Sequence, residues 1–289
     1  MDFRTDLALE RRELLRNSPP EGVESEQYSR DEIQFTKIKI TDSRGAESLG
    51  KPVGTYITAE FPALTDFSPT DSNIIYVIAE ELNTLLPEKG TILVAGLGNS
   101  DITPDAVGPR SASLVLATRH LSHELTENTG LGELRPTAVI TPGVLGRTGV
   151  ETAESVRGAA ETVKPSAVIV IDALAARRLS RLGSTLQMSD TGISPGSGVG
   201  NARGAITEET VGVPVISMGI PTVVDAQTII NDLSDGTINE ENREKRQMII
   251  TPREIDLVID RAARLIGFSI NKALQPHLSI DEIMMLTGS

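Results

Sequence analysis

A chain of 289 residues, 39% of them hydrophobic, can bury one large core or two modest ones. The lack of cysteine excludes disulfides, thiolate nucleophiles and cysteine-based metal sites, and only three histidines are available as metal ligands. The net charge of −13 argues against direct binding of nucleic acid, and no apolar run reaches the roughly 18 residues that a membrane helix needs. With no secretory signal at the N-terminus, we expect a cytoplasmic protein that contacts no membrane.

Residues 1–32 are polar and charged. Their pattern predicts a short helix around 7–16 and then a loop at the Ser-Pro-Pro-Glu-Gly breaker of 18–22, so we expect an arm outside the core. Two segments with period-two alternation follow, 34–41 and 55–61. They predict an antiparallel hairpin, because glycine and proline lie between them.

The period changes to that of a helix between 71 and 86, and from there strands and helices alternate. Apolar strand runs lie at 91–95, 137–141, 167–171, 184–188 and 214–218, and helical patterns at 109–123, 151–163, 223–233 and 252–274. Continuous apolar strands between helices are typical of a buried parallel sheet. We expect a single α/β domain, 1–289: a three-layer α/β/α sandwich around a mixed, mostly parallel sheet (phosphorylase/hydrolase-like), with the arm and the β-hairpin added.

The segment 96–109, Gly-Leu-Gly-Asn-Ser-Asp-Ile-Thr-Pro-Asp-Ala-Val-Gly-Pro, follows the strand predicted at 91–95. Its Gly-x-Gly start suggests a dinucleotide fingerprint, but Asp101 stands where the third glycine belongs, and no acidic residue ends a second strand about 20 residues on. The glycines are better explained as a tight turn that lets the backbone approach a ligand. Asp105 either caps the next helix or offers a carboxylate at the ends of the strands.

Asp172 follows the apolar run 168–171 and offers a second carboxylate. The carboxyl ends of parallel strands meet at one edge of a sheet, so Asp105 and Asp172 could share one site there. Burial raises the pKa of a carboxyl group, and a second carboxylate nearby raises one of the two further. A pair that shares one proton can supply the acid and the base for attack of water on an amide. The alternative is that Asp172 only caps the segment after it.

A long Gly/Ser-rich loop, 189–201, follows the strand predicted at 184–188. Its Asp-Thr-Gly triplet matches that of pepsin-type proteases, but those are all-β, so we interpret Asp190 as a supporting or substrate-contact residue on a binding rim or lid. His120, on the helix predicted at 109–123, is either an ordinary helix histidine or a metal ligand. Arg177 either pairs with a carboxylate or is a solvated charge.

Five segments together resemble the spore germination proteases, peptidase family A25: 4–8, 96–109, 171–177, 189–201 and 219–226. The resemblance covers nearly the whole chain. It implies a fold similar to that of hydrogenase maturation endopeptidases and an aspartic-type endopeptidase, in older classification a metalloprotease. Such an enzyme degrades small acid-soluble spore proteins during germination, forms a homotetramer and resides in the cytoplasm of the forespore and in the spore core.

The family's two catalytic aspartates fall on Asp105 and Asp172 of this chain. Residues expected to bind substrate or to support the site are Gly98, Asn99, Asp190, Gly196, Gly198, Arg177 and His120. An aspartate pair implies no cofactor. In the alternative, Asp105 and Asp172 bind a divalent metal that activates the water, with His120 as the nearby histidine. A third possibility is a non-catalytic α/β protein that binds a nucleotide or a peptide through its glycine-rich loops.

The segment 5–10, Thr-Asp-Leu-Ala-Leu-Glu, resembles the acidic–hydrophobic–alanine pattern at which the family cuts its substrates. It falls in the predicted arm, where we expect an accessible backbone. The resemblance implies an inactive precursor that cleaves itself between Asp6 and Leu7 and so removes a propeptide, 1–6. Low pH should promote this step, because one aspartate of the pair must carry a proton. Longer family members carry an insertion where this chain has a short charged segment, 233–248.

Overall fold

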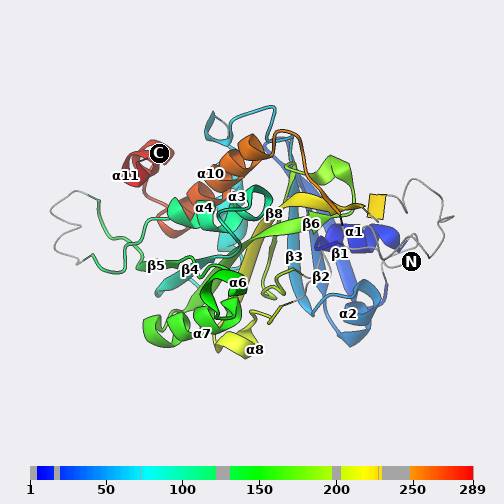
Figure 1. Cartoon of the computed structure of the whole chain (residues 1–289), viewed down its shortest axis with the longest axis horizontal. Helices are drawn as coiled ribbons and strands as arrows, with labels where there is room; N and C mark the ends of the chain where they lie inside the picture. The colour runs from blue at the N-terminus through cyan, green and yellow to red at the C-terminus, as the bar shows by residue number, and fades with distance from the viewer. Residues whose placement is uncertain are drawn as a thin grey trace.

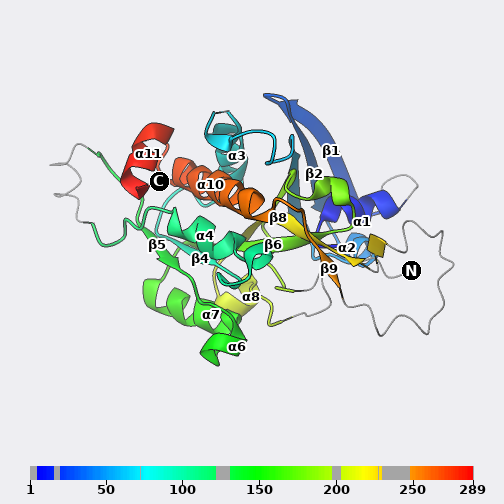
Figure 2. The ribbon, with the colours of Figure 1, turned by 45° about the horizontal axis from the view of Figure 1, so that its top comes forward.

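The computed structural model describes residues 5–15, 20–71, 73–121, 131–196, 203–226, 228–229 and 248–288. These residues form a sheet with helices on both of its faces (Figure 1; Figure 2). The predicted α/β class, with its mixed sheet and helix layers, is confirmed. The short charged segment after 233 lies almost wholly outside the described residues.

The nine strands of the sheet are β1 (Val23–Arg30), β2 (Ile33–Ile40), β3 (Gly54–Glu60), β4 (Ile92–Gly96), β5 (Thr137–Ile140), β6 (Ala167–Ala176), β7 (Thr185–Ser189), β8 (Val215–Asp225) and β9 (Ile249–Ile250). The α-helices are α1 (Ala8–Leu14), α2 (Ser43–Leu49), α3 (Ile74–Asn83), α4 (Val107–Ser113), α6 (Leu145–Thr148), α7 (Thr152–Val163), α8 (Glu208–Val211), α10 (Ile255–Leu274) and α11 (Ile280–Thr287). Three 3-10 turns complete the described elements: η1 (Pro69–Asp71), η2 (Thr103–Asp105) and η3 (Leu179–Arg181).

The strands lie in the order β1-β2-β3-β7-β8-β6-β4-β5, with β9 paired to β8. Parallel pairing is confined to β5, β4, β6 and β8, and the other described pairs are antiparallel. More of the strand pairs are therefore antiparallel than the alternation of strands and helices in the sequence suggests, and the sheet is mixed but not mostly parallel. The antiparallel pairing predicted for 34–41 and 55–61 is confirmed as β2 and β3, but the two strands are joined through α2 and not by a hairpin turn.

Strand β6 lies inside the sheet, between β8 and β4, and is buried on both faces. Ile169 and Ile171 belong to the apolar cluster under α3, α4 and α10, whereas Val168 and Val170 belong to the cluster under α7 and α8. Because side chains alternate along a strand, Asp172 continues the face of Val168 and Val170. The two-sided burial explains why this strand is a continuous apolar run in the sequence.

The predicted arm is wrong in two places. Residues 23–30 form β1, which pairs with β2 along its whole length. Because β1 is an edge strand with most of its side chains partly or fully exposed, it lacks the apolar alternation by which strands are recognised. Leu7 and Ala8, in turn, are fully buried. Leu7 packs with residues of β6 and β8, and Ala8 packs with residues of β2 and β3, so this segment is part of the core.

Strands β6 and β8 are longer than predicted, because each continues beyond its apolar run to Ala176 and to Asp225. Asp172 therefore lies inside a strand and not after one, and the predicted helix 223–233 is wrong at its start. The predicted helix 109–123 is wrong beyond Ser113. There the backbone turns away, because Asn271 of α10 accepts from the Leu116 N–H and donates to the Leu114 carbonyl.

A buried carboxylate tethers α1 to the segment after β6. Glu10 is fully buried and accepts hydrogen bonds from the backbone N–H groups of Arg177, at 2.6 Å, and of Arg178, at 3.0 Å. The Arg181 Nε atom lies 3.4 Å from Glu10 Oε1, and the Thr5 hydroxyl also donates to this carboxylate. A charge-assisted network of this kind holds the N-terminal segment against the sheet.

We expect Glu10→Gln to lower the free energy of unfolding by about 1–3 kcal/mol, because one backbone donor and part of the Arg181 charge lose their acceptor. Urea denaturation measures the change. Glu47→Gln, on the exposed side of α2, is the matched control and should change stability by less than about 0.5 kcal/mol. Equal stability of the two variants would show that the buried carboxylate is not a tether.

Candidate active site

The two aspartates singled out by the sequence line one cavity of about 480 Å³. The cavity lies where β4 ends, beside the second half of β6. Asp105 and Asp172 share its wall with Asp6, which belongs to the N-terminal segment. Three aspartates from segments far apart in the sequence therefore line the same cavity.

Asp105 ends the turn η2, and the loop after β4 positions its carboxylate. The Asn99 N–H donates to Asp105 Oδ2 at 2.7 Å. Gly98 has a φ of +111°, and a Cβ atom at this position would lie 2.1 Å from the Asp105 carbonyl oxygen, so the tight turn requires glycine. Burial raises the pKa of Asp105, although the Asn99 N–H and the Arg203 charge both lower it.

Asp172 projects from β6 with 6% of its surface exposed. Its Oδ1 atom accepts a hydrogen bond from the Ala173 N–H at 2.9 Å. Burial raises the pKa of Asp172 well above its ordinary value, and the charges of Asp105 and Asp6 raise it further. The pair therefore keeps a proton to a higher pH than two exposed aspartates would.

The N-terminal segment occupies the edge of β6 that β4 leaves open. Where β4 ends, the Leu97 N–H donates a hydrogen bond to the Ile171 carbonyl of β6 at 2.8 Å. Farther along this edge, the Asp6 N–H donates to the Ala175 carbonyl at 2.9 Å, and the Ala175 N–H donates to Asp6 Oδ2 at 2.8 Å. The expectation that the Asp6–Leu7 bond lies in an accessible arm is wrong, because Leu7 is buried and Asp6 lines the cavity.

Three of the predicted supporting residues are near the pair. Gly98 and Gly196 line the cavity. Asn99 holds Asp105 in place and lines an adjoining cavity of about 330 Å³. Gly198 lies outside the described residues.

The other three predicted supporting residues do not line the cavity. Asp190 Oδ1 accepts from the Thr55 N–H at 2.7 Å and so joins the end of β7 to the start of β3. The Arg177 N–H donates to Glu10, as described above. His120 is exposed in a turn after the end of α4, because the helix that was predicted to carry it stops at Ser113.

Thr222 and Arg203 are functional candidates that the sequence did not single out individually. Both line the cavity, and the Thr222 hydroxyl donates to the Pro104 carbonyl at 2.8 Å, next to Asp105. Arg203 places a positive charge near Asp105. Thr222 lies within the segment 219–226 that carries the family resemblance, and this was the one signal that could have found it.

Across the described part of the chain, no three side chains of histidine, aspartate or glutamate come together in a way that could hold a metal ion. Catalytic zinc sites use three protein ligands. The donor set of the cavity therefore does not fit a resident metal of this kind.

Comparison with known proteins decides the family. The model of the family described as germination protease matches residues 5–248. The germination protease of Caldanaerobacter subterraneus subsp. tengcongensis is 44% identical over 99% of this chain and 98% of that protein. One from Clostridium perfringens is 40% identical over 98% of each chain, and one from Geobacillus sp. is 42% identical over 99% of this chain and 96% of its own.

The chain belongs to the germination protease family. It is accordingly a protease of spore germination. Among solved structures, the [NiFe] hydrogenase maturation protease HycI from Thermococcus kodakarensis aligns with a TM-score of 0.37 at 18% identity, over 66% of this chain and 98% of that one. Among the helices described here, none is long and apolar enough to cross a membrane.

The raised pKa of Asp172 predicts a pH-dependent gain in stability for Asp172→Asn. The folded protein binds this proton more tightly than the unfolded chain, whose aspartates titrate near about pH 4, so stability is lost as the pH rises from about 4 through the raised pKa. Asparagine removes the charge and still accepts from the Ala173 N–H. We expect the melting temperature of the variant to exceed that of the wild type at neutral pH, by about 2–4 °C for each kcal/mol gained in the free energy of unfolding.

This difference should shrink towards zero as the pH falls below about 4, where Asp172 becomes protonated in both states. Scanning calorimetry over this range measures it. The exposed Asp66→Asn is the matched control and should show no such trend. A variant less stable than wild type at neutral pH would mean that contacts in the fold stabilise the ionised carboxylate.

Proposed function

We propose that this protein is an endopeptidase in which Asp105 and Asp172 activate a water molecule, and that its substrates are the small acid-soluble proteins of the spore. One observation carries the proposal. Two carboxyl groups of raised pKa, Asp172 buried and Asp105 partly buried, line a single cavity, beside an edge of β6 to which an extended chain segment already pairs.

The proposed chemistry needs one proton on the pair. The ionised carboxylate takes a proton from the water as it attacks the carbonyl carbon, and the protonated partner gives its proton to the departing amide nitrogen. The burial and coupling of Asp172 favour it as the protonated member at the start. The products are a carboxylate and an amine, and the scheme requires no cofactor.

The edge of β6 offers a way to hold a substrate in extended form. Ala175 presents both its N–H and its carbonyl on this edge, and Asp6 already uses both. A substrate strand added here would have its backbone held by main-chain bonds, as in β-strand addition. An acidic residue placed like Asp6 fits the acidic–hydrophobic–alanine pattern of the predicted cleavage site.

The same contacts support a zymogen that processes itself. While Asp6 occupies the edge of β6, a substrate strand cannot pair there, so the uncut chain is expected to be inactive. Cleavage between Asp6 and Leu7 would free this edge. Leu7 would stay in place, because it packs against Leu174, Ala176 and Val224.

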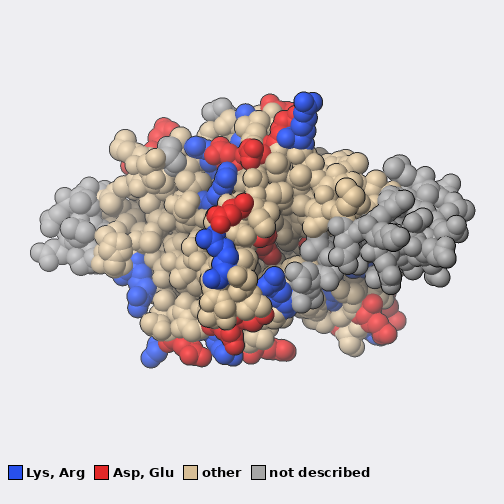
Figure 3. All heavy atoms as spheres, in the orientation of Figure 1, with Lys and Arg blue, Asp and Glu red and all other residues tan. Residues whose placement is uncertain are grey.

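The wider setting is proposed from the family resemblance: a homotetramer in the cytoplasm of the forespore and in the spore core. Direct binding of nucleic acid is not part of the proposal. Acidic side chains lie among the basic ones on the face shown in Figure 3, and the net charge of −13 repels phosphates. Light scattering of the purified protein tests the tetramer.

We expect Asp105→Asn and Asp172→Asn each to lower the rate of cleavage of a small acid-soluble spore protein by at least about 10²–10⁴-fold, because each removes a titrating group from the pair. Gel assays with processed enzyme follow the cleavage. Asp190→Asn is the matched control; it keeps the acceptor for the Thr55 N–H and should lower the rate at most a few-fold.

Near-normal cleavage by either of the first two variants would remove that aspartate from the mechanism. The assay is repeated with a chelator. Unchanged cleavage supports the metal-free pair, chelator-sensitive cleavage supports the alternative in which the carboxylates bind a divalent metal, and no cleavage by the processed wild type supports a binding protein.

We expect mild acid to start self-cleavage between Asp6 and Leu7. As the pH falls through the raised pKa of Asp172, the fraction of molecules with one proton on the pair increases, and the rate should fall again when both carboxyl groups are protonated. N-terminal sequencing over an acid incubation series should show Leu7 as the new first residue. Full activity of a chain that still starts at Met1 would contradict the zymogen, and a cut elsewhere within 1–20 would contradict only the site.

A further inference from the structure

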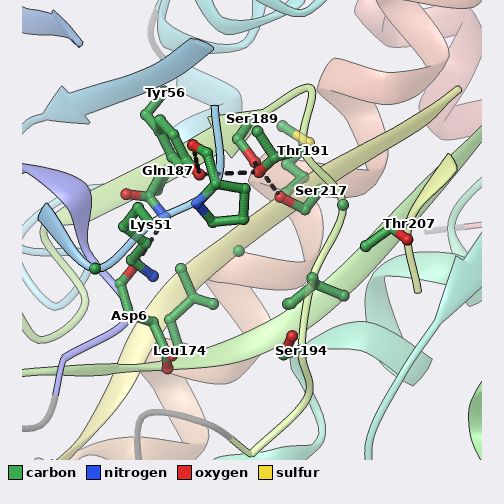
Figure 4. Close-up of a pocket in the computed structure, with 16 residues that line it drawn as sticks. Asp6, Lys51, Tyr56, Leu174, Gln187, Ser189, Thr191, Ser194, Thr207 and Ser217 are labelled. Atoms are coloured by element: carbon green, nitrogen blue, oxygen red, sulfur yellow. Dashed lines mark hydrogen bonds between the residues drawn. The ribbon is translucent and has the colours of Figure 1, made fainter. Parts of the chain in front are cut away.

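Two side-chain donors converge on the backbone carbonyl of Asp6. The Lys51 ammonium donates to this oxygen at 2.8 Å, and the Gln187 amide donates to it at 3.1 Å. In Figure 4 the three residues gather at one side of a second cavity, of about 200 Å³, on whose wall Asp6 also lies. Asp6 thus lies between this cavity and the one that contains Asp105 and Asp172.

Gln187 holds the chain on both sides of Leu7. While its Nε2 atom donates to the Asp6 carbonyl, its Oε1 atom accepts from the Ala8 N–H at 2.7 Å. Gln187 is buried within β7, so the strand fixes the position of its amide. The Asp6–Leu7 peptide bond is therefore held in one orientation, with its carbonyl oxygen directed at Lys51.

Lys51 follows α2 and is partly buried. Burial lowers the pKa of its ammonium, the nearby Asp6 charge raises it, and the Arg11 charge lowers it. Because Lys51 is partly buried, the interaction of its ammonium with a negative charge forming at 2.8 Å is stronger than it would be in bulk solvent.

We propose that Lys51 and Gln187 form the oxyanion site of this protease and act on the carbonyl of the acidic residue before the cleaved bond. This inference rests on the proposed function, because it takes the Asp6–Leu7 bond as a substrate of the aspartate pair. It assigns two residues that neither the sequence pattern nor the cavity around Asp105 singled out.

In the proposed step, water adds to the Asp6 carbonyl carbon, and the electron pair of the C=O bond moves to the oxygen. Lys51 and Gln187 stabilise this oxyanion by hydrogen bonds and, for Lys51, by charge. The C=O bond forms again as the C–N bond to Leu7 breaks, and the aspartate pair transfers the proton from the water to the leaving nitrogen. Lys51 and Gln187 keep their own protons throughout.

The absence of cysteine from the chain allows a chemical rescue of the Lys51 charge. Lys51→Cys is alkylated in denaturant and refolded. 2-Bromoethylamine restores an ammonium at nearly the original reach, whereas iodoacetamide adds a neutral amide that can still donate hydrogen bonds. The rate of self-cleavage between Asp6 and Leu7 is then followed by mass spectrometry across the acid range, with wild type taken through the same steps.

We expect Lys51→Cys to cleave itself about 10²–10³-fold more slowly than wild type, because removal of one oxyanion donor from a protease typically lowers the rate by this factor. Aminoethylation should restore the rate to within about tenfold, and the neutral adduct should leave it low. Lys39→Cys, at an exposed position of β2, is the matched control and should cleave at the wild-type rate with either adduct. Gln187→Glu keeps the acceptor for the Ala8 N–H but loses the donor, and should also slow cleavage.

Several outcomes overturn the inference. Lys51→Cys that cleaves at the wild-type rate shows that Lys51 does not act on the carbonyl. Equal rescue by the neutral and the cationic adduct shows that Lys51 only holds the segment in place, because a holding role needs a hydrogen bond and no charge. If aminoethylation fails to restore the rate, the positive charge at this position does not stabilise the oxyanion. If neither wild type nor Lys39→Cys cleaves its own Asp6–Leu7 bond, the proposed function is overturned, and the oxyanion site with it.

Discussion

The difference in length between two neighbouring strands shapes the rest of the site. Strand β4 ends at Gly96, opposite Ile171, whereas β6 continues to Ala176. Buried backbone groups need hydrogen-bond partners. The part of the β6 edge that extends beyond β4 must therefore be paired by another part of the chain. The loop after β4, the Asp172 side chain, Asp6 and Glu10 supply partners in turn.

This arrangement also explains the electrostatics. Pairing of the N-terminal segment with the edge of β6 brings the Asp6 carboxylate near Asp172, so its charge adds to burial and to the Asp105 charge in raising the pKa of Asp172. It also directs the Asp6 carbonyl at Lys51 and Gln187. Occupation of the edge and preparation of the bond for cleavage are thus two consequences of one set of contacts.

The errors in the sequence predictions share a physical cause. The lengths of β6 and β8 and the early end of α4 depend on partners distant in sequence, such as Asn271. The burial of Leu7 depends on the ends of β6 and β8 in the same way. Local periodicity contains no information about such partners, whereas the regular helices α7 and α10 agree closely with their predicted ranges.

The sequence by itself determined the α/β class, the antiparallel pair of β2 and β3 and the selection of Asp105 and Asp172 as candidates, because hydrophobic periodicity and the placement of polar residues after apolar runs are local properties. Tertiary structure alone decided that the two aspartates share a cavity with Asp6, and that His120, Arg177 and Asp190 lie elsewhere. The reason is that these relations depend on which strand edge is left open. That edge is defined only when strands far apart in the chain have paired.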